Sequence, residues 1–282
     1  MWPLLLLAGL SSASPAPATT VVVRPPSQLA AAAEAERIGR DIYDFDQAAW
    51  GSTDALIAAM PDPGSAGVRG WIVEREPAGT VAIFYGLNGD QPYKLFVAHM
   101  QGKNVLSQHV VAANEDRGMT PIERRMVAAR TVVMTPDTLR KIGFQRCSNA
   151  SINSVVLPPD TPDGVVPVYV LTPQATLDSF PIGGHYRVDV AADGSIVRSR
   201  AFARSCIAMD RKQTPKPVMF YVTHLLDPQP TEIHVWVSLA SGSAAGGWNR
   251  AVGRCLDRGQ RPYEIRIDVA RAGSDQKVIC PA

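Results

Sequence analysis

The chain has 282 residues, 46% of them hydrophobic and 19% charged, with a formal net charge of +2. This composition excludes a disordered chain, because it provides enough apolar surface for one large core or two smaller ones. The net charge is too small to favour nucleic-acid binding, which needs a concentrated basic face.

The first residues predict an export signal. Residues 2–10 read WPLLLLAGL, an apolar run far shorter than the roughly 20 residues that a membrane-spanning helix needs. Small residues follow, and the pattern fits signal cleavage after Ala18, with a cut after Ala13 as the alternative. We expect a signal peptide over 1–18, a flexible arm over 19–27, and a periplasmic or secreted mature protein without a membrane span.

The cysteines predict two disulfide bonds. The chain has four, widely spaced and without a C-x-x-C pair: Cys147, Cys206, Cys255 and Cys280. An even number of spaced cysteines in an exported chain is typical of a disulfide framework. Three pairings are possible, and the shorter loops favour Cys147–Cys206 with Cys255–Cys280.

Apolar residues near the N-terminus follow a helical period. They recur every three or four positions from Ile38 to Ala49, which places them on one helix face. This pattern predicts an amphipathic helix over residues 28–47. A second, shorter helix is expected over 53–60, where Pro61 ends it.

Residues 68–112 contain four strand-like runs that are separated by short turns. The Asn88-Gly89 pair is a strong signal for a tight turn. Because such short links join neighbouring antiparallel strands, this segment predicts a β-meander.

The next segment carries a helix start. Thr120 is followed by Pro121 and by Glu123 three positions on, which predicts a capping box. A short helix begins in the same way at Thr135. The first of these helices is expected to bury a stripe made of Ile122, Met126, Ala129 and Val133. Residues 28–142 are thus predicted to form one unit of helices and a meander.

The remaining residues, 143–282, predict a second β-rich unit that contains all four cysteines. The expected strands are VVPVYVLT (165–172), HYRVDVA (185–191), SIVRSRAF (195–202), PVMFYVTHLL (217–226), TEIHVWVSLA (231–240) and YEIRIDVA (263–270). The fold class is therefore α+β, with two mostly antiparallel sheets and a few covering helices.

Histidines are the candidates for catalysis. On the expected strand at 231–240, alternation places His234 on the face opposite Ile233. His185, His224 and His234, with Asp227 or Glu232, could converge at one end of the second sheet as an acid–base pair or as metal ligands. The competing interpretation is that each histidine packs against its surroundings or bonds to a loop.

Arginine and tryptophan residues are the candidates for binding. Arg198 and Arg200 share one strand face and could meet an anionic glycan, lipid head group or peptide, unless they form a solvated outer face. Trp71, Trp236 and Trp248 could line a carbohydrate or peptide groove. For Trp71 and Trp236 the competing interpretation is packing in the core, so Trp248 is the preferred exposed aromatic residue.

Two segments of the second unit resemble known sequences. Gly183–Arg187 reads GGHYR, and Thr223–Val235 reads THLLDPQPTEIHV. Both are similar to segments of uncharacterised exported proteins of Gram-negative bacteria. The resemblance implies export and a bacterial source, and it assigns no catalytic residue.

Familiar catalytic signatures are missing from the sequence, among them G-x-S-x-G, H-E-x-x-H, the Walker loop and G-x-G-x-x-G. We therefore predict no cofactor and no metal site. The expected role is that of a non-enzymatic envelope or binding protein, whose partner is an envelope ligand or another protein. The alternative is a hydrolase or metal-dependent enzyme that uses His185, His224 and His234. A binding role requires an exposed apolar or aromatic groove.

Overall fold

The computed structural model describes residues 26–176, 178–210, 226–227, 229–243, 250–256 and 262–268. Several predictions lie outside these residues: the signal peptide, most of the flexible arm, most of the strand at 217–226, and the side chains of His224, Trp248 and Cys280. Within the described residues the fold is α+β, as predicted, with four helices, two four-stranded antiparallel sheets and two smaller strand pairs.

Helix α1 (Pro26–Ala59) is one continuous helix of 34 residues, so the predicted division into two helices was wrong. The glycine between them, Gly51, does not break the helix because it serves a contact. A Cβ there would lie 2.2 Å from the carbonyl oxygen of Lys103, so only glycine lets the helix approach the strands this closely. As predicted, Ile42 and Phe45 are buried.

The first sheet is the predicted meander. It consists of β1 (Gly70–Glu76), β2 (Gly79–Asn88), β3 (Gln91–Gln101) and β4 (Asn104–Val110), in that spatial order and antiparallel throughout. The turn between β2 and β3 contains Gly89 at a φ of 59°, a left-handed conformation that favours glycine.

Helices α2 (Pro121–Val133) and α3 (Pro136–Lys141) follow the meander. The predicted capping box is present: the Thr120 hydroxyl accepts from the Glu123 amide, and the Glu123 carboxylate accepts from the Thr120 amide. The predicted stripe is buried at its three later positions, but Ile122, in the first turn of α2, is 39% exposed.

The second main sheet contains β5 (Asn153–Val156), β6 (Val166–Leu171), β8 (Tyr186–Val190) and β9 (Ile196–Ala201), again antiparallel and in that order. Three of its strands match predicted ones, and the short β5 was not predicted.

Two small strand pairs complete the described sheets. They are β7 (Ser179–Pro181) with β10 (Ala208–Asp210), and β11 (Arg250–Leu256) with β12 (Pro262–Asp268). Of these, only β12 corresponds to a predicted strand.

The predicted strand at 231–240 is in fact helix α4 (Glu232–Ser243). Its apolar residues satisfy a period of two only over short stretches, whereas Ile233, Trp236, Val237 and Ala240 recur at helical spacing, and all four are buried. The helix packs against α1 at Gly39, where a Cβ would lie 2.5 Å from Cβ of Val235.

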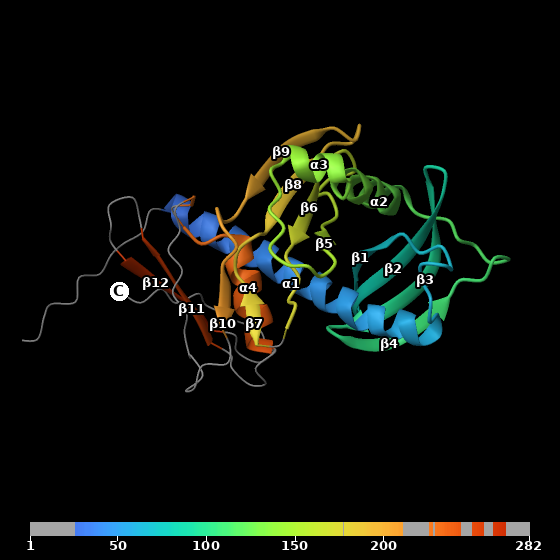
Figure 1. Ribbon diagram of the computed structural model, residues 1–282, viewed down its shortest axis with the longest axis horizontal. Helices are drawn as coiled ribbons and strands as arrows, with labels where there is room; N and C mark the ends of the chain where they lie inside the picture. The colour runs from blue at the N-terminus through green and yellow to red at the C-terminus, as the bar shows by residue number, and fades with distance from the viewer. Residues whose placement is uncertain are drawn as a thin grey trace, which may run out of the picture.

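Helix α1 lies along both main sheets, with the meander at its C-terminal half and α4 crossing it (Figure 1). One core cluster joins α1, the meander, the second sheet and α4 through residues such as Phe45, Phe96, Tyr169 and Trp236. A second cluster lies between the two sheets and α2. The two predicted units therefore share their core, and the boundary at 142 stays a prediction. None of the described helices combines the length and apolar character needed to cross a bilayer.

Candidate functional site

The predicted bond between Cys147 and Cys206 is present, with the two Cα atoms 5.3 Å apart. It ties the loop before β5 to the loop before β10, and Gly184 passes so close that a Cβ there would lie 2.4 Å from Cys147 Sγ. The second predicted pairing involves Cys280, which lies outside the described residues, so it stays a prediction.

His185 is completely buried, and both nitrogens of its ring are used. The Thr172 amide donates to Nδ1 at 3.2 Å, so Nε2 carries the proton and donates to the Pro181 carbonyl at 3.3 Å. The ring also packs edge-on against Trp236, with the centroids 5.0 Å apart. Burial lowers the pKa of His185 from 6.5 to about 4, so the ring is neutral at physiological pH.

His234 lies in the first turn of α4, where it caps the helix. Its Nδ1 accepts from both the amide and the hydroxyl of Thr231, each at 2.9 Å. This contact resembles a capping box in which an imidazole replaces the usual glutamate.

The structure thus gives two of the three candidate histidines separate local partners, and His224 lies outside the described residues. Within the part of the chain that the structure describes, no three His, Cys, Asp or Glu side chains form a group that could hold a metal ion.

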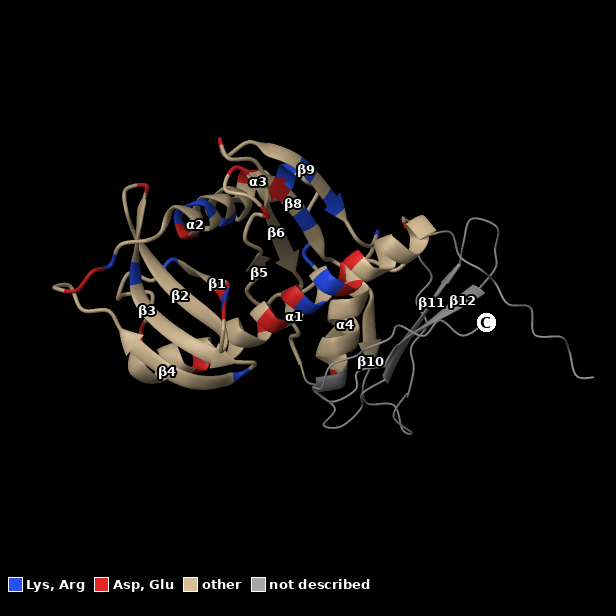
Figure 2. Cartoon of the chain, turned by 180° about the vertical axis from the view of Figure 1, so that it is seen from behind, with Lys and Arg blue, Asp and Glu red and all other residues tan. Residues whose placement is uncertain are grey.

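The two candidate arginines lie on β9, and each pairs with a carboxylate. Arg198 binds Asp189 at 2.6 Å, and Arg200 binds Asp227 at 2.6 Å. In Figure 2 the basic positions on β9 lie next to β8, which carries both an acidic and a basic position. Each arginine thus has an acidic partner in the same protein, although Asp189 is shared with Arg187 and the Arg198 side chain stays 60% exposed.

A pocket of about 520 Å³ opens where α1, α4, β1, β5 and the loop after β6 meet. Its walls contain two of the predicted groove tryptophans, Trp71 and Trp236, together with Trp50 and Phe180. Trp50 is 51% exposed and stands at the edge, whereas Trp236 and Phe180 are buried. The pocket therefore has an aromatic lining that extends from the core to the surface.

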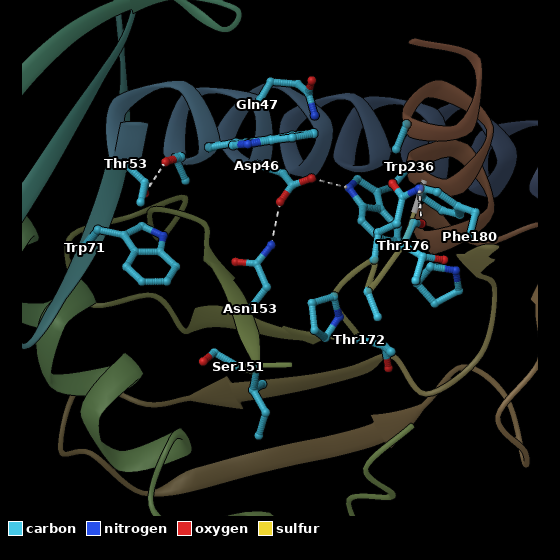
Figure 3. A pocket seen from close by; sticks show the side chains of 18 residues that line it. Asp46, Gln47, Thr53, Trp71, Ser151, Asn153, Thr172, Thr176, Phe180 and Trp236 are labelled. Atoms are coloured by element: carbon cyan, nitrogen blue, oxygen red, sulfur yellow. Dashed lines mark hydrogen bonds between the residues drawn. The ribbon is translucent and has the colours of Figure 1, made fainter. Parts of the chain in front are cut away.

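Asp46 provides the carboxylate of this pocket. Asn153 from β5 donates to its Oδ1 at 2.6 Å, and the Trp236 indole from α4 donates to its Oδ2 at 3.3 Å. Figure 3 shows Asp46 between Trp71 on one side and Trp236 and Phe180 on the other, with Asn153 pointing toward it. Three elements that are distant in the sequence thus meet at one carboxylate.

The environment of Asp46 raises the pKa of its carboxyl above the ordinary value. Burial is the main cause, and hydrogen bonds from Asn153 and Trp236 and the charge of Lys103 oppose it. Partial desolvation of Lys103 in turn lowers the pKa of its amine, against the attraction of Asp46 and Asp54.

Two of the tryptophans carry a cation on one face. Lys103 Nζ lies 3.6 Å from the centre of the Trp50 ring, and Arg130 Cζ lies 4.7 Å from the centre of the Trp71 ring. Arg130 is itself fixed by hydrogen bonds to Ser154 and Tyr85. These cations hold both indoles in place at the pocket wall.

A second hollow of about 440 Å³ adjoins the first. The two share lining at Thr172, Pro173, Ala175 and Pro181, and the second is closed by the loop at 146–150 next to the disulfide. Arg146 orders this loop, because its guanidinium donates to the carbonyls of Ser148, Asn149 and Ala150.

Sequence reasoning selected Trp71 and Trp236 as groove candidates but missed Asp46, Trp50 and Asn153. One signal was available: Asp46 lies beside Phe45 within the apolar period of α1, where a carboxylate is out of place unless it has partners. Comparison with protein-family models, with curated proteins and with solved structures finds no match.

Proposed function

We propose that this chain is a non-enzymatic binding protein of the periplasm or the cell exterior, and that its ligand occupies the aromatic pocket around Asp46. The observation that carries the proposal is the pocket itself. A preformed cavity of about 520 Å³, with aromatic walls and a few fixed polar groups, has the size and character of sites for small organic ligands.

The polar groups of the pocket are already oriented, which favours binding. Asp46 is held by hydrogen bonds from Asn153 and Trp236. The indoles of Trp50 and Trp71 are held by cation–π contacts with Lys103 and Arg130. A ligand entering such a site orders few side chains, so little of its contact energy is spent on reorganisation.

The alternative of an enzyme that uses His185, His224 and His234 gains no support from the two of these histidines that the structure describes. A general base or a metal ligand needs a nitrogen lone pair that faces the substrate or the metal. In His185 the lone pair of Nδ1 accepts a hydrogen bond from the Thr172 amide. In His234 the lone pair of Nδ1 accepts a hydrogen bond from the Thr231 amide.

The proposed location rests on the sequence of residues 1–18 and is supported by the disulfide, because such bonds persist in oxidising compartments. Residues 1–25 fused to a bacterial alkaline phosphatase without its own signal should yield active enzyme in the periplasm. A fusion that stays inactive in the cytoplasm would refute the proposed export.

The binding role is tested with the purified exported chain and a library of small organic fragments, observed by ligand-detected NMR. We expect fragments that bind the wild type and lose at least about tenfold in affinity in Trp50→Ala. The matched control is Leu106→Ala, because Leu106 is 52% exposed on β4 and lies outside the pocket lining. A library without such a fragment would refute the proposed function.

A further inference from the structure

We infer that the ligand of the aromatic pocket is a neutral oligosaccharide, whose chain continues past Pro173 into the second hollow beside the disulfide. This inference rests on the proposed binding function and specifies the ligand class. It combines three features of the described residues: the charges around the pocket, the donors and acceptors in it, and the second hollow next to it.

The charges disfavour an ionic ligand. The lining carboxylate, Asp46, repels anions, and Lys103 already provides its countercharge. A cation in the pocket would meet indoles that carry Lys103 and Arg130 on one face, which weakens the attraction of the opposite face for a further cation. A neutral ligand avoids both penalties.

The aromatic rings suit the faces of sugars. A pyranose ring presents C–H groups on its faces and hydroxyl groups at its edge, so it combines an apolar surface with a polar rim. The apolar faces of Trp50 and Trp71 provide the area against which such a ring packs.

The polar groups of the pocket suit hydroxyl groups. Asp46 accepts hydrogen bonds from Asn153 and Trp236, which leaves roughly two of its four acceptor positions for ligand hydroxyls. The remaining polar lining consists of uncharged amides and hydroxyls, among them Thr53 and Gln174. The Thr53 hydroxyl donates to the Ala49 carbonyl and the Gln174 amide donates to the Thr176 carbonyl, so these side chains chiefly offer acceptor oxygens to a ligand hydroxyl.

The second hollow favours a chain over a single ring. The two hollows share lining residues at Thr172, Pro173 and Ala175, and Ala175 is exposed, so a ligand seated in the first would continue over these residues into the second. The Arg146 guanidinium donates to three backbone carbonyls of the loop at 146–150. These bonds make the loop a rigid wall of the second hollow.

The test begins with an array of neutral and acidic glycans and proceeds to calorimetric titration of the exported full-length chain. We expect a neutral tetrasaccharide to bind, with an affinity at least about tenfold higher than that of its monosaccharide unit. Trp50→Ala should lower the affinity for the tetrasaccharide at least about tenfold, and Trp50→Phe should lower it less. Leu106→Ala should leave the affinity unchanged.

A second variant tests the path of the chain. Ala175 is exposed at the junction of the two hollows, so Ala175→Trp should obstruct the passage without entering the core. We expect it to reduce binding of the tetrasaccharide to the level of the disaccharide and to leave binding of the disaccharide unchanged. Equal weakening of both sugars would overturn the extended path.

The outcomes separate the two proposals. If no neutral glycan binds but tetragalacturonate, tetraalanine or a fragment binds in a Trp50-dependent way, the inference about sugars is overturned while the binding function stands. If neither glycans nor fragments bind in the pocket, both are overturned.

Discussion

Asp46 has an environment that makes its charge costly. The pKa of its carboxyl is raised above 3.8 because burial disfavours the ionised form. The folded protein therefore holds this proton more tightly than the unfolded chain does. The stability that protonated Asp46 contributes is present below pH 3.8 and is lost as the pH rises through the folded pKa.

The corresponding prediction concerns Asp46→Asn, which keeps the size of the side chain but does not titrate. The melting temperature of the variant relative to wild type should rise as the pH increases from about 3.5 to about 7. Thermal unfolding followed by circular dichroism at several pH values measures this difference. A difference that is independent of pH would contradict the assignment.

His185 has the opposite pH dependence. Its pKa is lowered from 6.5 to about 4 by burial, so between these values the unfolded chain binds a proton that the folded protein does not. The stability contributed by the neutral ring is present above pH 6.5 and is lost as the pH falls toward 4. The shift corresponds to a free energy on the order of 3 kcal/mol.

We predict that His185→Gln reduces this acid sensitivity. Glutamine can accept from the Thr172 amide and donate to the Pro181 carbonyl, but it has no charge to bury. Urea unfolding at about pH 7 and about pH 4.5 should show a smaller loss of stability in the variant than in wild type. Equal losses would mean that other groups dominate acid unfolding.

Local contacts of single residues were predictable where the partner is close in sequence. The capping box of Thr120 and Glu123 follows from their spacing of three. The role of His185 was not predictable, because its partners, Thr172 and Pro181, are brought to it by the tertiary fold.

At the scale of elements, the crossing of α1 and α4 depends on Gly39. In a helix, Gly39→Ala should stabilise by about 1 kcal/mol through helix propensity alone. The added Cβ would lie 2.5 Å from Cβ of Val235 and 2.6 Å from the carbonyl oxygen of Glu232, so the two helices must separate. We predict a net loss of roughly 1–3 kcal/mol in the free energy of unfolding.

Chemical denaturation of Gly39→Ala measures this effect. Gly64→Ala is the matched control, because the nearest atom to its added Cβ is 3.6 Å away and its stability should remain within about 0.5 kcal/mol of wild type. A Gly39→Ala variant that is as stable as wild type would contradict the close crossing.

The elements themselves were predictable to different degrees. The meander was predictable because its turn residues lie between clearly alternating runs. Helix α4 was not, because Glu232–Ser243 contains apolar residues that satisfy a period of two over short stretches and a helical period over the whole segment. The helical conformation is favoured because α4 packs on α1. This packing cannot be recognised from the local sequence.

At the scale of the whole molecule, the Cys147–Cys206 bond closes a loop with a sequence separation of 59. Loop-closure entropy predicts that its loss destabilises the protein by about 4 kcal/mol. The double variant Cys147→Ser with Cys206→Ser should show this loss in urea unfolding. The double variant should also lose more affinity for the tetrasaccharide than for the disaccharide, because Cys147 lines the second hollow. A variant as stable as wild type would contradict this role.

The candidate site was only partly predictable, for a reason that concerns the whole chain. Trp71 and Trp236 were recognised as aromatic candidates, but their neighbours in the pocket come from α1, β5 and the loop after β6. Asp46 and Asn153 are 107 positions apart, and no local pattern links residues over such a distance.

The bond between Asp46 and Trp236 spans 190 positions, nearly from the first described helix to the last. Contacts of such long range form slowly, since the intervening chain must be ordered first. A chain that emerges from a ribosome or a translocation channel with its N-terminus first holds Asp46 long before Trp236 arrives. The α4 side of the pocket therefore forms late in folding, and until then the face of α1 around Gly39 lacks the helix that covers it.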